Sequence, residues 1–162
     1  MEKRKGAADY DKNMVVKTTI EEPDLVWLDV REAPFSLHGV WFDEAQGTYV
    51  RMPQSIADAT NEGVAHLNKN TAGGRVRFVT DSPVIALCAE MKNEPAHDHL
   101  TRCGQSGFDL YCKKDGADTY VRTFRPPAGM EEGYSSLLPS VARACIPSIS
   151  RCTIMCRRCM WA

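Results

Sequence analysis

The sequence predicts an all-β domain, a jelly-roll-like β-sandwich of antiparallel strands. Short stretches alternate apolar and polar residues with a period of two, which is typical of half-buried strands. Turn signals separate these stretches at irregular spacing, and strands do not alternate with long helices along the chain. A chain of 162 residues is also the right size for a single core.

The clearest strands are expected in the middle of the chain. Gly74 to Thr80 places Val76 and Phe78 on one face, opposite a pair of arginines. Val84 to Met91 is a nearly continuous apolar run, as expected of a strand buried on both faces. The polar segment from Thr80 to Pro83 is the predicted turn between these strands.

A β-hairpin is predicted further along the chain. Phe108 to Lys113 and Thr119 to Arg125 flank the dipeptide Asp115-Gly116, which is the strongest short hairpin signal in a sequence. Helix is expected only over Thr60 to Leu67, with Thr60 as the N-cap. Weaker strand candidates lie upstream, at Leu25 to Val30, Gly39 to Phe42 and Thr48 to Met52.

Charge and hydropathy argue against two classes of partner. The chain has 20 Lys and Arg against 21 Asp and Glu, so it lacks the basic field that attracts nucleic acid. Residues 1–17 are polar and charged, without an apolar leader or a membrane span, and they are expected to fray. We therefore expect a cytoplasmic protein with no nucleic-acid or membrane partner.

The sequence lacks a complete catalytic constellation. A serine hydrolase needs a serine on a tight turn, a histidine base, an acid and oxyanion donors. The nearest approach is Ser82, which lies between Asp81 and Pro83, where a hydroxyl typically caps turn backbone groups. No Gly-x-Ser-x-Gly elbow occurs. On its own the chain is expected to have no catalytic residue and to be no enzyme.

Two clusters raise the question of a metal ion. His97 and His99, beside Glu94 and Asp98, lack a third ligand at fixed spacing, which favours a solvated loop. A zinc site of four cysteines normally uses two Cys-x-x-Cys pairs, and the tail has one. The tail cysteines are Cys145, Cys152, Cys156 and Cys159. We expect no metal and no cofactor; a zinc-binding interaction module is the alternative that rests on the tail.

Several phrases occur together in an order that is typical of one family. They are Tyr49-Val50-Arg51-Met52-Pro53, Leu67-Asn68-Lys69-Asn70-Thr71-Ala72-Gly73, Arg75-Val76-Arg77-Phe78-Val79-Thr80-Asp81-Ser82, Pro95-Ala96-His97-Asp98-His99 and Gly107-Phe108-Asp109-Leu110-Tyr111. Over roughly residues 24 to 134 the chain resembles the GxDLY domain, which precedes the catalytic domain of many bacterial SGNH (GDSL-like) hydrolases. Met52 and Thr71 replace the usual Leu and Ser. The motif residues, expected to be mainly structural, are Arg51, Ala72, Gly73, Asp81, Ser82, His97, Gly107, Asp109, Leu110 and Tyr111.

The resemblance implies a jelly-roll-like fold and places the chemistry in a different domain. An SGNH catalytic domain with a Gly-Asp-Ser nucleophile block is expected downstream, in an esterase that removes acyl groups from carbohydrates. The present chain would then be a non-catalytic accessory domain that orients or partly walls the active site. The alternative is a free-standing carbohydrate-binding β-sandwich, in which Trp27, Trp41 or Tyr120 stacks on sugar faces.

The pentapeptide that names the domain also has a physical interpretation. Gly107 permits a bulge or a close backbone approach at a strand entry. Asp109 is suited to accept backbone N–H bonds, and Leu110 alternates into the core between Asp109 and Tyr111. These features favour a structural role over ligand contact.

The tail does not continue the family pattern. After Ser136 the sequence loses strand and helix periodicity, and residues 137–162 are expected to be poorly ordered and dispensable. A frameshift explains such a tail. In the shifted frame Met155-Cys156 and Met160-Trp161 can only encode Val, and suitable codons upstream permit a strand that begins Tyr-Thr-Ile-Tyr-Ile. We therefore predict a family domain over 1–136 and a foreign tail over 137–162.

Overall fold

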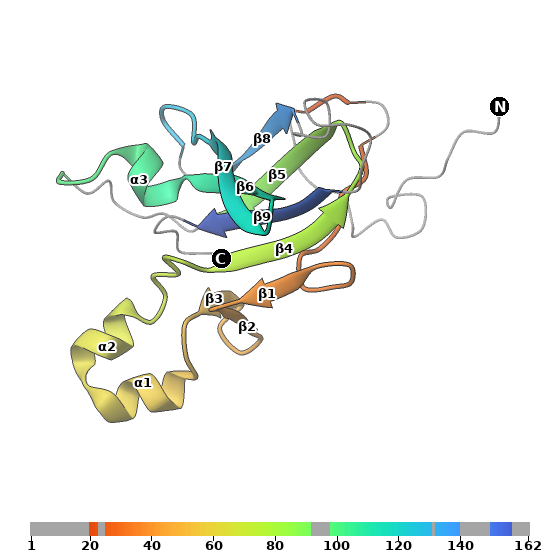
Figure 1. Cartoon of the computed structure of the whole chain (residues 1–162). Helices are drawn as coiled ribbons and strands as arrows, with labels where there is room; N and C mark the ends of the chain where they lie inside the picture. The colour runs from red at the N-terminus through yellow and green to blue at the C-terminus, as the bar shows by residue number, and fades with distance from the viewer. Residues whose placement is uncertain (1–19, 23–24, 92–97, 131, 140–149, 157–162) are drawn as a thin grey trace.

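The structure, a computed structural model, describes residues 20–22, 25–91, 98–130, 132–139 and 150–156 (Figure 1). The strands are β1 (Ser36–His38), β2 (Trp41–Asp43), β3 (Thr48–Val50), β4 (Arg75–Thr80), β5 (Val84–Glu90), β6 (Phe108–Lys114), β7 (Ala117–Phe124), β8 (Gly133–Pro139) and β9 (Ser150–Cys156). The helices are α1 (Gln54–Thr60), α2 (Glu62–Leu67) and α3 (Arg102–Ser106). Every strand pairing in the described part is antiparallel, so the predicted all-β, antiparallel class is confirmed.

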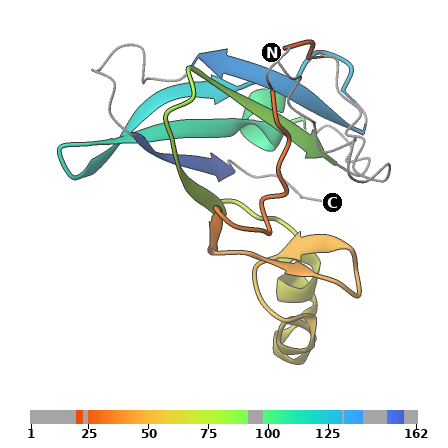
Figure 2. The same ribbon diagram turned by 90° about the vertical axis from the view of Figure 1, so that its right-hand side faces the viewer.

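The strands form one large sheet and two ribbons. The five-stranded sheet has the order β1-β4-β9-β6-β7, and β2-β3 and β5-β8 form two-stranded sheets. One apolar cluster joins side chains of β4, β6 and β7 to side chains of β5 and β8, so the core lies between the large sheet and the β5–β8 ribbon. The helical hairpin α1–α2 projects away from these layers in both views (Figures 1 and 2). The jelly-roll connection order stays a prediction.

Strands β4 and β5 lie where the sequence predicts them. Val76 is buried and Phe78 packs against the core, while Arg75 and Arg77 are only partly buried. The burial of β5 alternates between buried and half-buried residues, so the prediction of a strand covered on both faces was wrong. The reason is that the ribbon turns one face to the core, and the other face is only half covered.

The β6–β7 hairpin follows the predicted turn chemistry. Lys114 pairs with Ala117, and the two residues between them, Asp115 and Gly116, have φ values of 50° and 85°. Positive φ at both central residues defines a type I′ turn, whose twist matches that of the flanking strands. The hairpin that the Asp-Gly signal predicted is therefore confirmed.

The helices depart from the prediction in number and in capping. The N-cap of α2 is Asn61, whose Oδ1 accepts from Val64 N at 2.9 Å. Thr60 instead ends α1, and its hydroxyl donates to Ile56 O at 2.8 Å. Helices α1 and α3 were not predicted because seven and five residues are too few to set up a helical hydrophobic period. Within the described ranges no helix is long and apolar enough to cross a bilayer.

The tail contributes a strand, which the sequence does not predict. Strand β9 lies between β4 and β6 and pairs with both, with Ile154 opposite Val76 and Leu110. Residues 150–156 therefore form a strand, and the expectation that the tail is poorly ordered and dispensable stays a prediction. Pairing joins backbone groups that every residue carries, so the strand edges of β4 and β6 accept a segment without period-two alternation. Residues 1–17, 140–149 and 157–162 lie outside the described residues.

The weak upstream candidates are shortened or lost. Leu25 to Val30 contains no strand, and the candidate at Gly39 to Phe42 corresponds to the three residues of β2. Short strand β1, which pairs with β4, was not predicted. Three-residue strands carry too little alternation to be recognised from the sequence.

Candidate functional site

The family pentapeptide begins where helix α3 ends and β6 starts. Gly107 is buried, and its N–H donates to Cys103 O at 3.0 Å. A Cβ at this position would lie closer than 3.0 Å to the same carbonyl oxygen, whereas the φ of −85° is open to any residue. The predicted close backbone approach is confirmed. The bulge lies further along, between Leu110 and Tyr111.

Asp109 is buried within the β6–β7 pair. Its carboxylate accepts from the Thr123 hydroxyl at 2.6 Å, and Thr123 is its cross-strand partner. The Tyr120 hydroxyl lies 2.8 Å from the same Thr123 oxygen. Because Thr123 has one proton and donates it to Asp109, Tyr120 is the donor to Thr123. The chain Tyr120–Thr123–Asp109 therefore holds the carboxylate across two strands; its predicted bonds to backbone N–H groups stay a prediction.

The last two motif residues divide between core and surface. Leu110 is fully buried, as its alternation predicts. Tyr111 is half-buried, and its ring meets that of Tyr120 edge to face with centroids 5.8 Å apart. The pentapeptide thus serves packing at four of its positions, including fully buried Phe108.

A second group of motif residues lies at the base of the α1–α2 hairpin. Arg51 is exposed directly after β3, and its backbone N–H donates to Asn68 O at 3.0 Å. Ala72 and Gly73 are exposed in the turn before β4, where Gly73 has a φ of +81°. This left-handed conformation explains the glycine. The preceding residue in the motif, Thr71, is fully buried.

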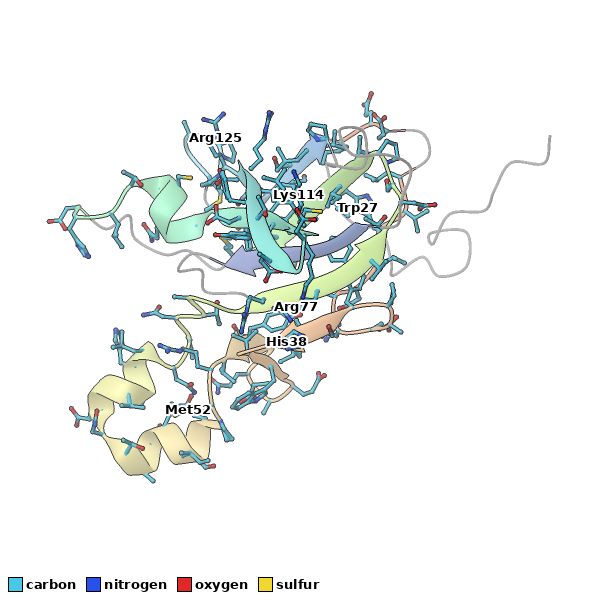
Figure 3. All side chains as sticks on the ribbon, in the orientation of Figure 1. Trp27, His38, Met52, Arg77, Lys114 and Arg125 are labelled. Carbon is cyan, nitrogen blue, oxygen red and sulfur yellow. The ribbon has the colours of Figure 1, made fainter. Side chains whose placement is uncertain are left out.

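Asn68 closes this base and was missed by sequence reasoning. It is buried, and its Oδ1 accepts from Met52 N at 3.0 Å. Its Nδ2 donates to Met52 O at 2.9 Å and to Gln54 Oε1 at 3.1 Å. Figure 3 places Met52 where β3 leads into the hairpin. An asparagine beside Lys69 and Asn70 looks like an ordinary turn residue, so the sequence contains no signal for this clamp.

The third group forms the turn between β4 and β5. Asp81 is exposed, and the Ser82 hydroxyl donates to Val84 O at 2.7 Å. The Ser82 N–H donates to Thr80 Oγ1 at 3.0 Å. The proton that a general base would remove is therefore held by a backbone carbonyl, in the turn-capping role that the sequence predicts.

The motif residues are not gathered into one site. Gly73 and Asp81 flank the six residues of β4, which separate them by roughly 20 Å. The pentapeptide starts two strands away, on β6. His97 lies outside the described residues, as does Glu94. Among the residues that are described, these groups do not form a nucleophile, base and acid within reach of one another.

Metal ligands are also dispersed in the described part of the chain. No group of three His, Cys, Asp or Glu lies close enough there to hold an ion. Asp98 and His99 form an exposed pair at 3.2 Å. Cys152 and Cys156 are four positions apart along β9, a backbone separation of about 13 Å. The alternative of a zinc-binding module in the tail stays a prediction, since Cys145 and Cys159 are outside the described residues.

The aromatic residues proposed for sugar stacking lie on separate elements. Tyr120 is 52% exposed on β7, and Trp41 is 38% exposed on β2, which belongs to a different sheet. Trp27 is half-buried in the segment before β1. The structure does not bring these rings onto one strand or one sheet.

Comparison with known proteins places this architecture in a family. The family model of GxDLY, the N-terminus of SGNH-hydrolase-type esterases, matches residues 25–141. No curated protein matches the chain. A crystal structure described as a GDSL-like lipase from Bacteroides ovatus ATCC 8483 matches with a TM-score of 0.56 and 25% identity. That match covers 65% of this chain and 29% of the lipase chain.

The chain belongs to the GxDLY family, the N-terminal domain of SGNH-type hydrolases. The matched range reaches residue 141, past the expected boundary at Ser136, and so includes all of β8. The family part of the chain therefore ends in the interval between β8 and β9.

Proposed function

We propose that this chain is the non-catalytic N-terminal accessory domain of an SGNH/GDSL-type hydrolase. The observation that supports it best is that two polar motif side chains make hydrogen bonds inside the domain. The carboxylate of Asp109 is bonded across two strands, and the hydroxyl of Ser82 is bonded to a turn carbonyl. Both are therefore occupied in holding the fold. The match to an esterase N-terminus supplies the class of the catalytic partner.

We further propose that the parent enzyme is an esterase acting on acylated carbohydrates. The support is the resemblance to the GxDLY family and the extent of the match, since this chain spans only 29% of the Bacteroides ovatus lipase chain. A domain of this size leaves ample room in such a protein for a separate catalytic domain. The free-standing carbohydrate-binding alternative has weaker support, because its candidate aromatics lie on different sheets.

The DNA that follows the codon of Pro139 tests this proposal. We expect a reading frame there that encodes a Gly-Asp-Ser block and a later Asp-x-x-His. We also expect that the protein in which this frame is joined to the domain removes acetyl groups from an acetylated oligosaccharide. Deleting residues 1–139 from the joined protein should lower kcat/KM. Absence of the Gly-Asp-Ser block from every frame, or an unchanged kcat/KM after the deletion, would contradict the proposal.

A further inference from the structure

The base of the α1–α2 hairpin combines exposed apolar side chains with exposed motif residues. We use the name hairpin base for Arg51, Ile56, Leu67, Ala72 and Gly73. Ile56 is 55% exposed and Leu67 is 47% exposed. Single exposed apolar side chains are normal on a protein surface, so these two values alone do not define a binding surface.

Two motif residues of the hairpin base, Arg51 and Ala72, are not explained by burial, since both are exposed. Gly107, Asp109 and Leu110 are explained by burial and by bonds inside the fold. Arg51, by contrast, is exposed, and its side chain makes no hydrogen bond or ion pair with any residue that the structure describes. Ala72, in a second motif segment, is exposed in the turn before β4. A guanidinium in this state is available to a carboxylate of another domain.

The hairpin base is held in a fixed position. The Asn68 side chain bonds to both backbone groups of Met52, and its carbonyl accepts from Arg51 N. Ile56 lies in the first turn of α1, and Leu67 directly precedes Asn68. The exposed apolar side chains are therefore presented within one helical turn of the clamp, on a preorganised surface.

The direction of β9 brings the continuing chain to this place. Strand β9 runs antiparallel to β4 and β6, so it ends where both of those strands begin (Figure 1). Met155 pairs with Arg75, which follows Gly73 by two residues. When the alternative-frame strand takes the place of β9 in the joined protein, a domain that follows it by a short linker starts beside the hairpin base. In the Bacteroides ovatus lipase, of which this chain covers 29%, most of the protein lies outside the matched domain.

From these observations we infer that the hairpin base is the docking surface for the hydrolase domain that follows in the joined protein. The inference rests on the proposed function and deepens it, because it names the surface and the chemistry of the partner. The hydrolase domain contributes an apolar patch that covers Ile56 and Leu67, and a carboxylate that pairs with Arg51. The hairpin then positions the two domains relative to each other.

Hydrogen exchange of the joined protein and of the 162-residue chain tests this inference. We expect backbone amides in residues 51–73 to exchange about tenfold more slowly, or slower still, in the joined protein. If the hydrolase is active but only other segments are protected, the hairpin base is not the docking surface, whereas the proposed function still stands. An unprotected domain whose deletion leaves kcat/KM unchanged would overturn both.

Matched substitutions separate docking from folding. Ile56→Asp and Leu67→Asp should restore fast exchange in the joined protein and leave the melting temperature of the 162-residue chain unchanged. Val79→Asp is the control, since Val79 is 49% exposed but lies at the opposite end of β4 from Arg75. Arg51→Ala should weaken protection more than Arg51→Lys does. Equal effects of Leu67→Asp and Val79→Asp would contradict the inference.

Discussion

Two buried contacts fix the junction between α3 and β6 at the residue scale. Gly107 brings its backbone against the Cys103 carbonyl, and the Tyr134 hydroxyl reaches the carbonyls of Ser106 and Phe124 at 2.9 and 3.0 Å. One hydroxyl proton serves two acceptors, so the bond is shared between them. The Tyr134 hydroxyl joins segments that are distant in sequence, and Gly107 lies at a sharp turn after α3. Adding or removing one atom at either residue should therefore change the stability of the domain.

We predict that Gly107→Ala destabilises the domain by about 2 kcal/mol or more, because the added methyl overlaps a backbone carbonyl that cannot move without breaking α3. Urea unfolding of the two proteins measures the difference. Gly104→Ala is the control, since its Cβ would meet only the Thr101 hydroxyl, at 3.3 Å, and alanine favours helix. Equal losses for the two variants would show that Gly107 is not tightly packed.

Tyr134→Phe should cost about 1–2 kcal/mol, because it leaves two buried carbonyls without this donor. Tyr120→Phe removes the same atom from a residue that is 52% exposed, so water replaces much of what is lost. Chemical denaturation of both variants tests the difference. A Tyr134→Phe protein as stable as the unaltered chain would contradict the assignment.

At the scale of elements, the α1–α2 hairpin depends on one side chain. Asn68→Ala removes both partners of the Met52 backbone and should cost about 1–3 kcal/mol. We predict faster amide exchange across residues 51–68 and unchanged exchange in β6, because the hairpin projects away from the core. The control is Asn70→Ala, which removes the same type of side-chain amide two residues later and should leave amide exchange unchanged. Uniform acceleration in both variants would argue against a local clamp.

Strand β9 gives the tail a role that the sequence analysis did not expect. Truncation after Pro139 should expose the edges of β4 and β6, lower the melting temperature and promote association, since unpaired edges recruit other strands. Replacing the tail with the alternative-frame strand that begins Tyr-Thr-Ile-Tyr-Ile should raise stability above that of the unaltered chain. Thermal unfolding and light scattering test both. A truncated chain that stays monomeric and equally stable would show that β9 adds nothing.

The elements that could be predicted are those whose local chemistry agrees with the fold. Period-two alternation identified β4, and Asp115-Gly116 identified the β6–β7 hairpin. The Asn68 side chain bonds to Met52, which lies 16 positions away, and β9 pairs with the edges of β4 and β6. Neither contact produces a local sequence pattern, so neither could be predicted. Among the site residues, burial of Leu110 and capping by Ser82 were foreseeable, whereas the isolation of Arg51 was not.

At the scale of the whole molecule, the domain holds motif residues in three separate places around one core. The pentapeptide on β6 and the turn at Ser82 stabilise the fold. The hairpin base is exposed near the start of β4, where the antiparallel strand β9 ends. This distribution suits a domain that supports another domain, because the Arg51 side chain in the outward-facing group makes no hydrogen bond or ion pair with the residues that the structure describes. Among the residues that the structure describes, these groups do not bring an acid, a base and a nucleophile together.

Hydrolysis of p-nitrophenyl acetate by the purified 162-residue chain tests the central claim most directly. The Ser82 hydroxyl donates to Val84 O and the Asp109 carboxylate accepts from Thr123, so neither is placed for nucleophilic or general-base work. We predict no turnover above the buffer rate, and the same rate for Ser82→Ala. Turnover by the chain that disappears in Ser82→Ala would contradict the account.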